Sequence, residues 1–301
     1  MNQQFLTELK AVTAENRIFT DEQMKKHTTF RVGGPADILV QPKGTELASV
    51  IRLCRKYDVP YQVIGNGSNL LVGDRGIRGL VIEMLSKEDE ICVEDDCITV
   101  GAGMLLSKTA NRAADHGLTG MEFAAGIPGS IGGAVVMNAG AYGGEMKDIL
   151  TAVTVLDQEG NEKILSAEEL ELGYRTSCIL KKGYIVTGAK IKLKHGEETA
   201  IRARMEELKK QRVEKQPLEY PSAGSTFKRP EGYFAAKLIE DAGLKGCARG
   251  GAQVSEKHAG FVVNKGDATA KDVCELTDYI KSEVMEKFGV GLELEVVKVG
   301  F

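Results

Sequence analysis

The segment AAGIPGSIGGAVVMNAGAYGG, residues 124–144, constrains the fold more than any other part of the chain. It contains seven glycines and no charged side chain. A membrane-spanning helix needs about 20 predominantly apolar residues, but glycine and Pro128 dilute this segment, and Ser130 and Asn138 interrupt it. Glycine permits unusual backbone angles and lets the chain approach another group closely. The segment therefore predicts backbone that turns repeatedly and lies against a partner.

The composition excludes several classes of protein. The 301 residues suggest two or three domains. A net charge of −4 without a basic block predicts no nucleic-acid partner. Six cysteines without a C-x-x-C pair indicate free thiols in a reducing, cytoplasmic location. The N-terminus lacks the pattern of a signal peptide, no membrane segment is expected, and the four scattered histidines predict no metal site. We expect a monomer or a weak oligomer.

Hydrophobic periodicity and turn residues predict an α+β protein with mixed sheets. Its helices are expected at 45–57, 105–117, 198–215, 233–243 and 269–288, with a short one after a capping box at Ser166 and Glu169. Strands are expected at 61–65, 80–84, 184–194, 260–264 and 292–299, with hairpins across Asp95–Asp96 and across residues 158–161. The charged helix 198–215 is expected to face solvent and to mark a domain boundary.

GNGSNL, residues 65–70, invites a dinucleotide-binding interpretation because it follows a strand and begins G-x-G. Leu70 occupies the third glycine position of that fingerprint. No crossover helix fits between Gly67 and Leu80, and parallel strands ordinarily need one. We therefore reject this interpretation. The P-loop motif is also absent.

Ser225 and Lys228 match S-x-x-K, the nucleophile motif of penicillin-recognising enzymes. That motif needs a helix, which Pro230 would break, and the companion S-D-N and K-T-G motifs are missing. The residues alone favour a loop serine.

Five motifs in order change this interpretation: GNGSNLLV (65–72), GIPGSIGGAVVMNAGAYG (126–143), YRTS (174–177), AGSTFKRP (223–230) and LEVVKVG (294–300). Together they resemble the UDP-N-acetylenolpyruvoylglucosamine reductase family, of the vanillyl-alcohol-oxidase-type FAD-binding fold. The resemblance runs from about His27 onwards. It implies FAD-binding subdomains at 1–84 and 85–197, and a C-terminal α+β substrate-binding domain at 198–301. No extra tyrosine-bearing insertion is evident, which is typical of the shorter subtype.

The resemblance gives the glycine-rich segment a partner, non-covalently bound FAD. Successive backbone N–H groups can bind the negatively charged diphosphate without a lysine. The implied cofactor residues are Gly65, Asn66, Gly67, Ser68, Asn69, Leu70, Gly126, Pro128, Gly129, Ser130, Gly132, Gly133, Ala134 and Ile185.

The resemblance also implies the chemistry. NADPH reduces FAD, which delivers hydride to C3 of UDP-N-acetylglucosamine enolpyruvate, and Ser225 protonates C2. The product, UDP-N-acetylmuramate, is a peptidoglycan precursor. Arg175 and Glu295 are the implied partners of the substrate carboxylate, so the catalytic set is Ser225, Arg175 and Glu295. Further substrate contacts are implied for Tyr174, Arg212, Lys215 and Lys228. Arg229 and Val297 depart from the pattern of some members, so no contact is carried over to them.

Three alternatives stay open at this point. The chain could be another FAD enzyme of the same fold, such as an oxidase, although neither glycine-rich loop contains the His or Cys that tethers flavin in many of those enzymes. It could also be a non-catalytic nucleotide-sugar binder, or a serine hydrolase that uses Ser225 through S-x-x-K. The choice of NADPH over NADH rests on the resemblance alone.

Overall fold

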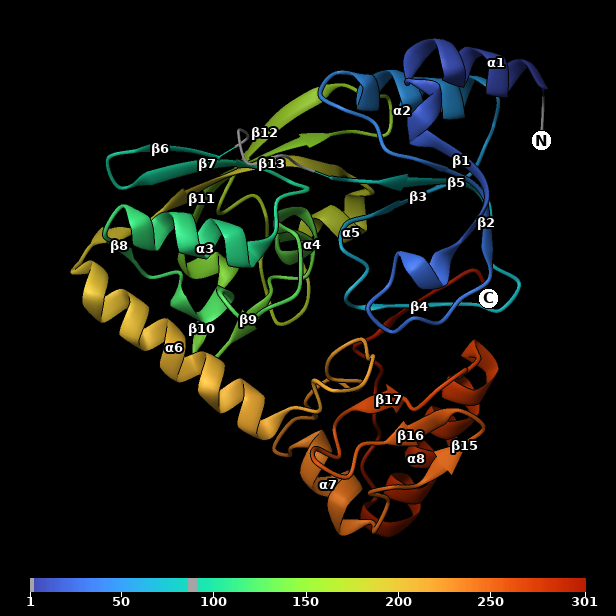
Figure 1. Ribbon diagram of the computed structural model, residues 1–301, viewed down its shortest axis with the longest axis vertical. Coiled ribbons are helices and arrows are strands. Elements are labelled where there is room, and N and C mark those ends of the chain that lie inside the picture. The colour runs from blue at the N-terminus through green and yellow to red at the C-terminus, as the bar shows by residue number, and fades with distance from the viewer. Residues whose placement is uncertain (1–2, 86–90) are drawn as a thin grey trace. The chain divides into compact units, whose positions relative to one another are not determined.

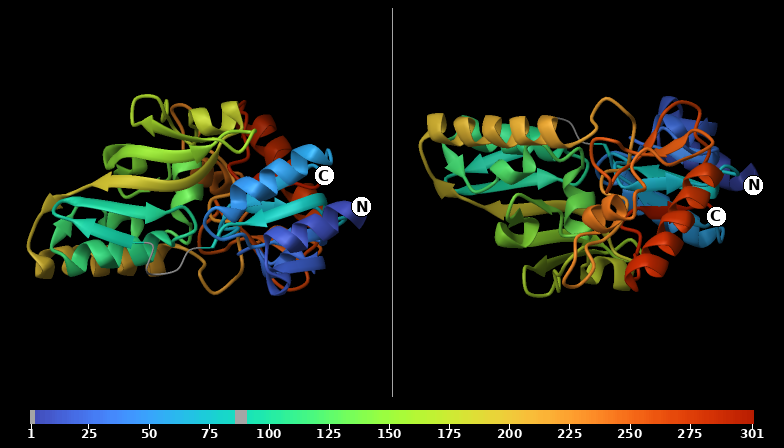
Figure 2. Two further views of the ribbon diagram at one scale, coloured as in Figure 1. Left: turned by 90° about the horizontal axis from the view of Figure 1, so that it is seen from above. Right: turned by 90° about the horizontal axis from the view of Figure 1, so that it is seen from below.

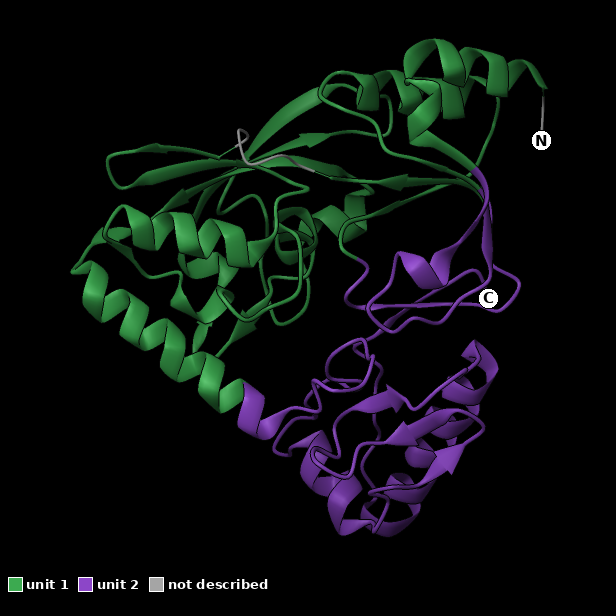
Figure 3. Ribbon diagram, viewed as in Figure 1, with its two compact units in different colours: residues 1–19, 38–66, 79–212 green, residues 20–37, 67–78, 213–301 purple. Residues whose placement is uncertain are grey.

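The computed structural model describes residues 3–85 and 91–301 of the chain. Two compact units emerge (Figure 3), one within residues 1–19, 38–66 and 79–212 and the other within residues 20–37, 67–78 and 213–301. We call them unit 1 and unit 2. The chain passes between them more than once, so each unit is built from separate segments. The finer division at residues 84 and 197 stays a prediction.

Helices and strands alternate irregularly along the chain (Figure 1), as the sequence predicts. The helices are α1 Gln3–Val12, α2 Glu46–Lys56, α3 Leu106–Asp115, α4 Ile131–Val136, α5 Cys178–Lys182, α6 Glu198–Lys215, α7 Ala235–Asp241 and α8 Ala270–Phe288. The first strands are β1 Ile18–Gln23, β2 Pro35–Val40, β3 Tyr61–Ile64, β4 Leu70–Val72, β5 Ile77–Glu83, β6 Ile91–Glu94, β7 Cys97–Gly101, β8 Leu118–Thr119 and β9 Gly140–Ala141. The others are β10 Gly144–Glu145, β11 Leu150–Leu156, β12 Glu162–Ser166, β13 Ile185–Lys192, β14 Lys194–His195, β15 Ala248–Arg249, β16 Ala252–Val254, β17 Val262–Asn264 and β18 Val297–Val299.

A five-stranded antiparallel sheet forms the centre of unit 1, in the order β12-β11-β13-β7-β6. It contains both predicted hairpins, β6–β7 and β11–β12. Helices α3 and α4 lie on one face of this sheet (Figure 1), and apolar side chains from both helices fill the core between them and the strands. Burial of apolar side chains is the main favourable contribution to the free energy of folding. The middle of the glycine-rich segment, which forms α4, is therefore packed into this core.

Helix α6 carries charged residues over most of its surface and lies alongside α3 (Figure 2). Arg202 on α6 pairs with Asp115 at the end of α3 at 2.5 Å. Ile201 and Leu208 are its buried residues, and the rest of the helix is mostly exposed, as expected.

A second core of unit 1 joins α1 and α2 to the parallel pair β3 and β5. The two strands are connected through residues 65–76, which contain the short strand β4 and no helix. The expectation that a parallel pair needs a crossover helix was therefore wrong here, because a twelve-residue connection of turns and one short strand joins the two strands. The rejection of the dinucleotide fingerprint still holds, since no helix follows the glycine-rich loop.

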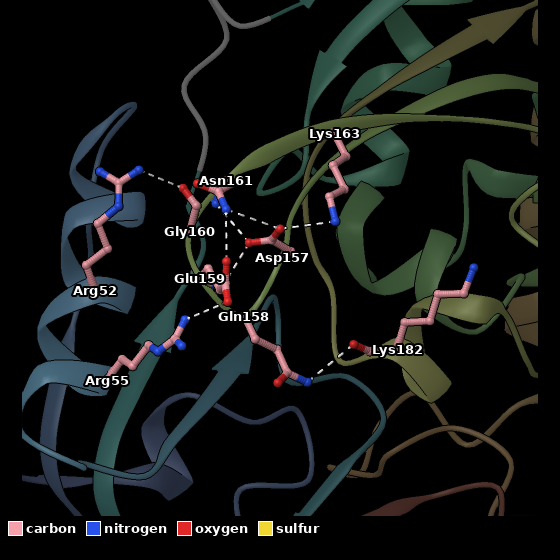
Figure 4. Close-up of polar contacts among 9 residues, drawn as sticks. All are labelled: Arg52, Arg55, Asp157, Gln158, Glu159, Gly160, Asn161, Lys163 and Lys182. Atoms are coloured by element: carbon pink, nitrogen blue, oxygen red, sulfur yellow. Dashed lines mark hydrogen bonds and ion pairs between the residues drawn. The ribbon is translucent and has the colours of Figure 1, made fainter.

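The turn between β11 and β12 links this second core to the large sheet (Figure 4). Arg52 of α2 donates to the Gly160 carbonyl at 3.0 Å, and Arg55 pairs with Glu159 at 3.1 Å. The Asp157 carboxylate accepts hydrogen bonds from N–H groups of the same turn. These contacts join the segments predicted as two FAD-binding subdomains within unit 1.

Unit 2 packs α7 and α8 against the antiparallel sheet β15-β16-β17 around its own apolar core. Strand β18 pairs in parallel with β4, so the end of the chain meets the segment that follows GNGSN. Among the described residues, no helix is long and apolar enough to cross a membrane.

Two local predictions were wrong. Ser166 and Glu169 exchange the hydrogen bonds of a capping box, at 2.8 and 3.3 Å, but they close a turn and no helix follows. The strand expected over 292–299 is shorter, because the backbone changes partner. Leu294 bridges to Phe227, a bend follows at Val296, and only then does β18 begin.

Candidate active site

The glycine-rich segment turns repeatedly, as predicted. Its middle forms the short helix α4, which Ser130 caps by accepting a hydrogen bond from the Gly133 N–H at 3.5 Å. Strands β9 and β10 follow as a tight hairpin, with Tyr142 and Gly143 at its tip. Both tip residues have positive φ, 54° and 87°, which is the backbone signature of a type I′ turn. The segment therefore uses glycine for a reversal as well as for close approach.

The two glycine-rich loops meet inside unit 1. A Cβ atom added to Gly65 would lie 2.0 Å from the Ser130 hydroxyl oxygen, which is far inside van der Waals contact. The Asn66 side chain donates to the Pro128 carbonyl at 2.6 Å. Five of the predicted cofactor residues are thus brought together: Gly65, Asn66, Pro128, Ser130 and Gly133.

The GNGSN loop presents unpaired backbone donors. The N–H groups of Asn66, Gly67 and Ser68 donate no hydrogen bond within the parts of the chain that the structure describes. Gly67 has a φ of +59°, the conformation that lets successive N–H groups converge. Because backbone donors require a partner when they are removed from water, this row fits an anion such as the diphosphate of FAD. The residues present therefore fit the cofactor that the sequence implies.

Arg212 lies beside the glycine-rich segment. A Cβ atom on Gly126 would lie 3.1 Å from Arg212 Cδ. Its half-buried guanidinium forms no ion pair or hydrogen bond with any residue that the structure describes. Burial lowers the pKa of Arg212, and nearby Tyr142 partly opposes the shift. An arginine held this way next to an uncharged loop is suited to a bound anion.

Arg175 occupies the tip of a tight turn. Gly173 and Thr176 exchange backbone hydrogen bonds of 3.1 and 3.3 Å across it. Arg175 has a φ of +54°, a conformation uncommon for a residue with a side chain. Its guanidinium donates to the Gly140 carbonyl at 3.4 Å and lies 5.1 Å from the centre of the Tyr174 ring, which is 53% exposed. The turn thus places a cation next to the glycine-rich segment.

Unit 2 brings together the residues predicted around Ser225. The Thr226 carbonyl accepts the Glu295 N–H at 2.9 Å, and the Asn69 side chain donates to the Glu295 carbonyl at 3.0 Å. Thr226 is buried, and its own N–H donates to the Gly260 carbonyl at 2.9 Å. Ser225 itself is exposed on this fixed backbone.

Lys228 lies three residues after Ser225, and its ammonium pairs with the Glu293 carboxylate at 3.2 Å. Residues 225–228 adopt no helical conformation. The lysine is therefore not carried back over Ser225 by a helical turn, and the S-x-x-K hydrolase interpretation loses its geometric basis. Arg229, whose role was left open, lies 4.0 Å from the centre of the Phe234 ring.

For some predicted residues, no contact within their own unit places them beside the glycine-rich loops or beside Ser225. Ile185 is buried against the α2 core rather than against the glycine-rich segment. Lys215 is exposed at the last position of α6. Leu70 pairs with Val297 at the start of β4. In the described ranges, no group of three His, Cys, Asp or Glu side chains is arranged to hold a metal ion.

Sequence reasoning missed two residues of this region, Asn138 and Ser177. Both are fully buried polar side chains, and both hydrogen-bond between the glycine-rich segment and the Arg175 turn. The signal for Asn138 was present in the sequence, because a buried amide within an apolar run needs partners. Ser177 carried no such signal beyond its place at the end of the YRTS motif.

Comparisons with known proteins agree with this geometry. A family model described as FAD binding domain matches residues 36–166, and the UDP-N-acetylenolpyruvoylglucosamine reductase C-terminal domain matches residues 216–299. UDP-N-acetylenolpyruvoylglucosamine reductases from Agathobacter rectalis and Clostridium botulinum are each 53% identical, over 100% of this chain and 99% of theirs.

Solved structures support the same family and fold. UDP-N-acetylenolpyruvylglucosamine reductase from Thermus caldophilus is 41% identical with a TM-score of 0.79, covering 94% of this chain and 98% of that one. p-Cresol methylhydroxylase, at 13% identity and a TM-score of 0.51, covers 98% of this chain and 67% of that one and shows the fold alone. The vanillyl-alcohol-oxidase-type fold is thereby confirmed. The chain belongs to the UDP-N-acetylenolpyruvoylglucosamine reductase family and is an FAD-dependent oxidoreductase.

Proposed function

We propose that the protein reduces UDP-N-acetylglucosamine enolpyruvate to UDP-N-acetylmuramate with NADPH, as a step in peptidoglycan precursor synthesis. The observation that carries this proposal is the pairing of residues 226–228 with residues 293–295 in unit 2. It places the proposed proton donor, Ser225, and the proposed glutamate, Glu295, on adjoining backbone segments held by 2.8 and 2.9 Å hydrogen bonds. Fixed geometry is what proton transfer to carbon requires.

Ser225 is assigned the proton that reaches C2 of the enolpyruvyl group. A hydroxyl is a weak acid, so the transfer is favourable only toward a carbanion-like C2, and water then reprotonates the serine oxygen. Ser225 makes no hydrogen bond with any described residue, which leaves its hydroxyl available for a substrate. Lys228 pairs with Glu293, so the carboxylate partly offsets the positive charge that the lysine contributes near Ser225.

Arg175 and Glu295 are assigned to the substrate carboxylate. A guanidinium stabilises the charge that develops there through paired N–H donors. Glu295 is half-buried, and two hydrogen bonds fix its backbone, one at the N–H group and one at the carbonyl. Arg212, Lys215 and Tyr174 are assigned to anionic or polar groups of the bound nucleotides. Arg212 is the best supported, because it has no counter-ion among the residues that the structure describes.

FAD, when bound, carries hydride from NADPH to the enolpyruvyl double bond. Within unit 1, the residues that would hold it are Gly65, Asn66 and Ser130, together with the rest of the uncharged segment 124–144. Neither loop contains His or Cys, which supports non-covalent binding. The preference for NADPH, the cytoplasmic location and the oligomeric state remain predictions.

An anaerobic absorbance experiment tests the proposal. We expect the purified protein to be yellow, NADPH to bleach it, and the enolpyruvyl sugar nucleotide to restore the colour. A spectrum that stays bleached after addition of the sugar nucleotide would refute the assignment. Acid precipitation separates the oxidase alternative, because a covalently tethered flavin would stay in the pellet.

Replacement of Ser225 by alanine tests the proton donor. General acids contribute about 10²–10⁴-fold to a rate, so we expect recovery of the oxidised spectrum to slow by about that factor while bleaching by NADPH continues. Ser222→Ala, in the same loop, is the matched control. Equal recovery rates for the two variants would remove Ser225 from this role.

A further inference from the structure

We propose that Ser177 and Asn138 are positioning residues that hold the Tyr174–Arg175 turn against the glycine-rich segment. The inference rests on the role of Arg175 in the proposed function. It concerns only contacts within unit 1. It assigns a function in the reaction to two buried polar side chains that do not touch the substrate in this scheme.

Three hydrogen bonds connect the turn to the segment. The Ser177 hydroxyl donates to the Val136 carbonyl at 2.6 Å, and the Asn138 amide donates to the Gly173 carbonyl at 3.1 Å. The third comes from the Arg175 guanidinium, which donates to the Gly140 carbonyl at 3.4 Å. The contacts lie at the two ends and at the tip of the turn. Together they fix its position and its orientation relative to the segment.

The Asn138 side chain is fully engaged. Besides Gly173, its amide donates to Glu145 at 2.6 Å, and its oxygen accepts the Lys147 N–H at 2.9 Å. Its φ of +44° is a conformation that asparagine adopts more readily than most residues. Asn138 and Ser177 are both 0% exposed, so water cannot replace these bonds. Buried, satisfied polar networks of this kind specify one arrangement.

The backbone conformation at the tip of the turn depends on the structure around it. Tyr174 is exposed, and Arg175 adopts positive φ, which persists only where surrounding structure imposes it. Without the Ser177 and Asn138 bonds, the Arg175 backbone is free to relax toward negative φ and carry the guanidinium away. A displacement of about 1 Å in such a group can cost about a hundredfold in rate. The polar contacts are therefore expected to act on catalysis through Arg175.

A double-mutant cycle between Ser177→Ala and Arg175→Lys tests this. We expect Ser177→Ala alone to slow reoxidation of the reduced protein by the sugar nucleotide by about tenfold, mainly in kcat. In the Arg175→Lys background, the same change should alter the rate by less than about twofold, because residues that act through one another are not additive. Flavin affinity and bleaching by NADPH should change by less than about twofold, since Ser177 contacts neither loop's free N–H groups.

Thr277→Val is the matched control. It removes another buried hydroxyl that donates to a helix carbonyl, Cys274, at 3.0 Å, but in unit 2. It should leave reoxidation unchanged in both backgrounds. An effect of Ser177→Ala that persists with Lys at position 175, or that matches the control, would overturn the inference.

Asn138→Asp decides the question if Ser177→Ala does not fold. The change keeps the shape and the acceptor for Lys147 but replaces the donor facing Gly173 and Glu145 by an oxygen. A loss of reoxidation that disappears in the Arg175→Lys background supports the inference, and a loss independent of Arg175 refutes it. Wild-type protein that the sugar nucleotide never reoxidises would instead refute the proposed function.

Discussion

Replacement of Asp74 by alanine should destabilise unit 2 measurably. Asp74 lies just after β4 and caps the start of α8 from outside the helix. Its carboxylate accepts the N–H groups of Ala270 at 2.7 Å and of Lys271 at 3.0 Å, while Thr269 accepts the next one, from Asp272, at 3.1 Å. The first N–H groups of a helix have no partner within it. Asp74 thus satisfies two of these three donors.

The size of the effect follows from their exposure. Ala270 is fully buried, so water cannot replace the acceptor that its N–H loses. This loss costs about 1–2 kcal/mol of stability. Lys271 is exposed, so its N–H can rehydrate and the loss is about 0.5 kcal/mol. Removing a negative charge from a helix N-terminus costs about another 0.5 kcal/mol. We expect Asp74→Ala to lower the free energy of unfolding by about 2–3 kcal/mol and Asp74→Asn by about half as much.

Urea unfolding followed by far-UV circular dichroism measures this, because the chain contains no tryptophan. A loss of that size corresponds to a midpoint lower by about 1 M urea. Asp278→Ala is the matched control, since that side chain lies on the same helix and is 74% exposed. A midpoint for Asp74→Ala equal to that of the control would show that α8 does not depend on this cap.

Two further predictions concern the cofactor loop and pH. Gly65→Ala should weaken FAD binding by at least about tenfold, because the new methyl must displace the Ser130 hydroxyl. Titration of the apoprotein with FAD, followed by flavin fluorescence, measures the dissociation constant. An unchanged dissociation constant would contradict the close contact. The Glu46 pKa is lowered chiefly by its hydrogen bonds to Arg17, so this pair stabilises the fold above the unfolded pKa of about 4.3 and the stabilisation is lost as pH falls through the folded value. The urea midpoint of Arg17→Met should therefore fall less than that of the wild type between pH 5 and about pH 3. Equal falls in the two proteins would show that the pair contributes nothing to stability.

Elements with strong periodicity could be predicted from the sequence closely. The heptad-like spacing of Leu47, Val50, Ile51 and Cys54 gave α2 within a residue or two of its observed bounds. Hairpins with polar turns, such as β6–β7, were equally clear. Such elements are determined locally, because each buries one face whatever its neighbours are.

Predictions that depended on partners were less successful. The segment 292–299 alternates like one strand, yet it pairs first with Phe227 and then with Leu70. Ser166 and Glu169 make a capping box without a helix. In each case local preference allows two outcomes and long-range packing selects one.

The sequence by itself determined that a chain with seven glycines and no charge in 21 residues must present bare backbone to a partner, because such a segment has few side chains with which to build a core. It also supplied the residue types for the chemistry, Ser225, Arg175 and Glu295. Only the tertiary structure decided what holds them. Asn138 and Ser177 hydrogen-bond to backbone groups about 35–41 residues away in the chain, and Asn69 does so across 226 residues. The contact of a side chain with a backbone carbonyl so distant leaves no pattern in the order of side chains, since every residue carries the same carbonyl.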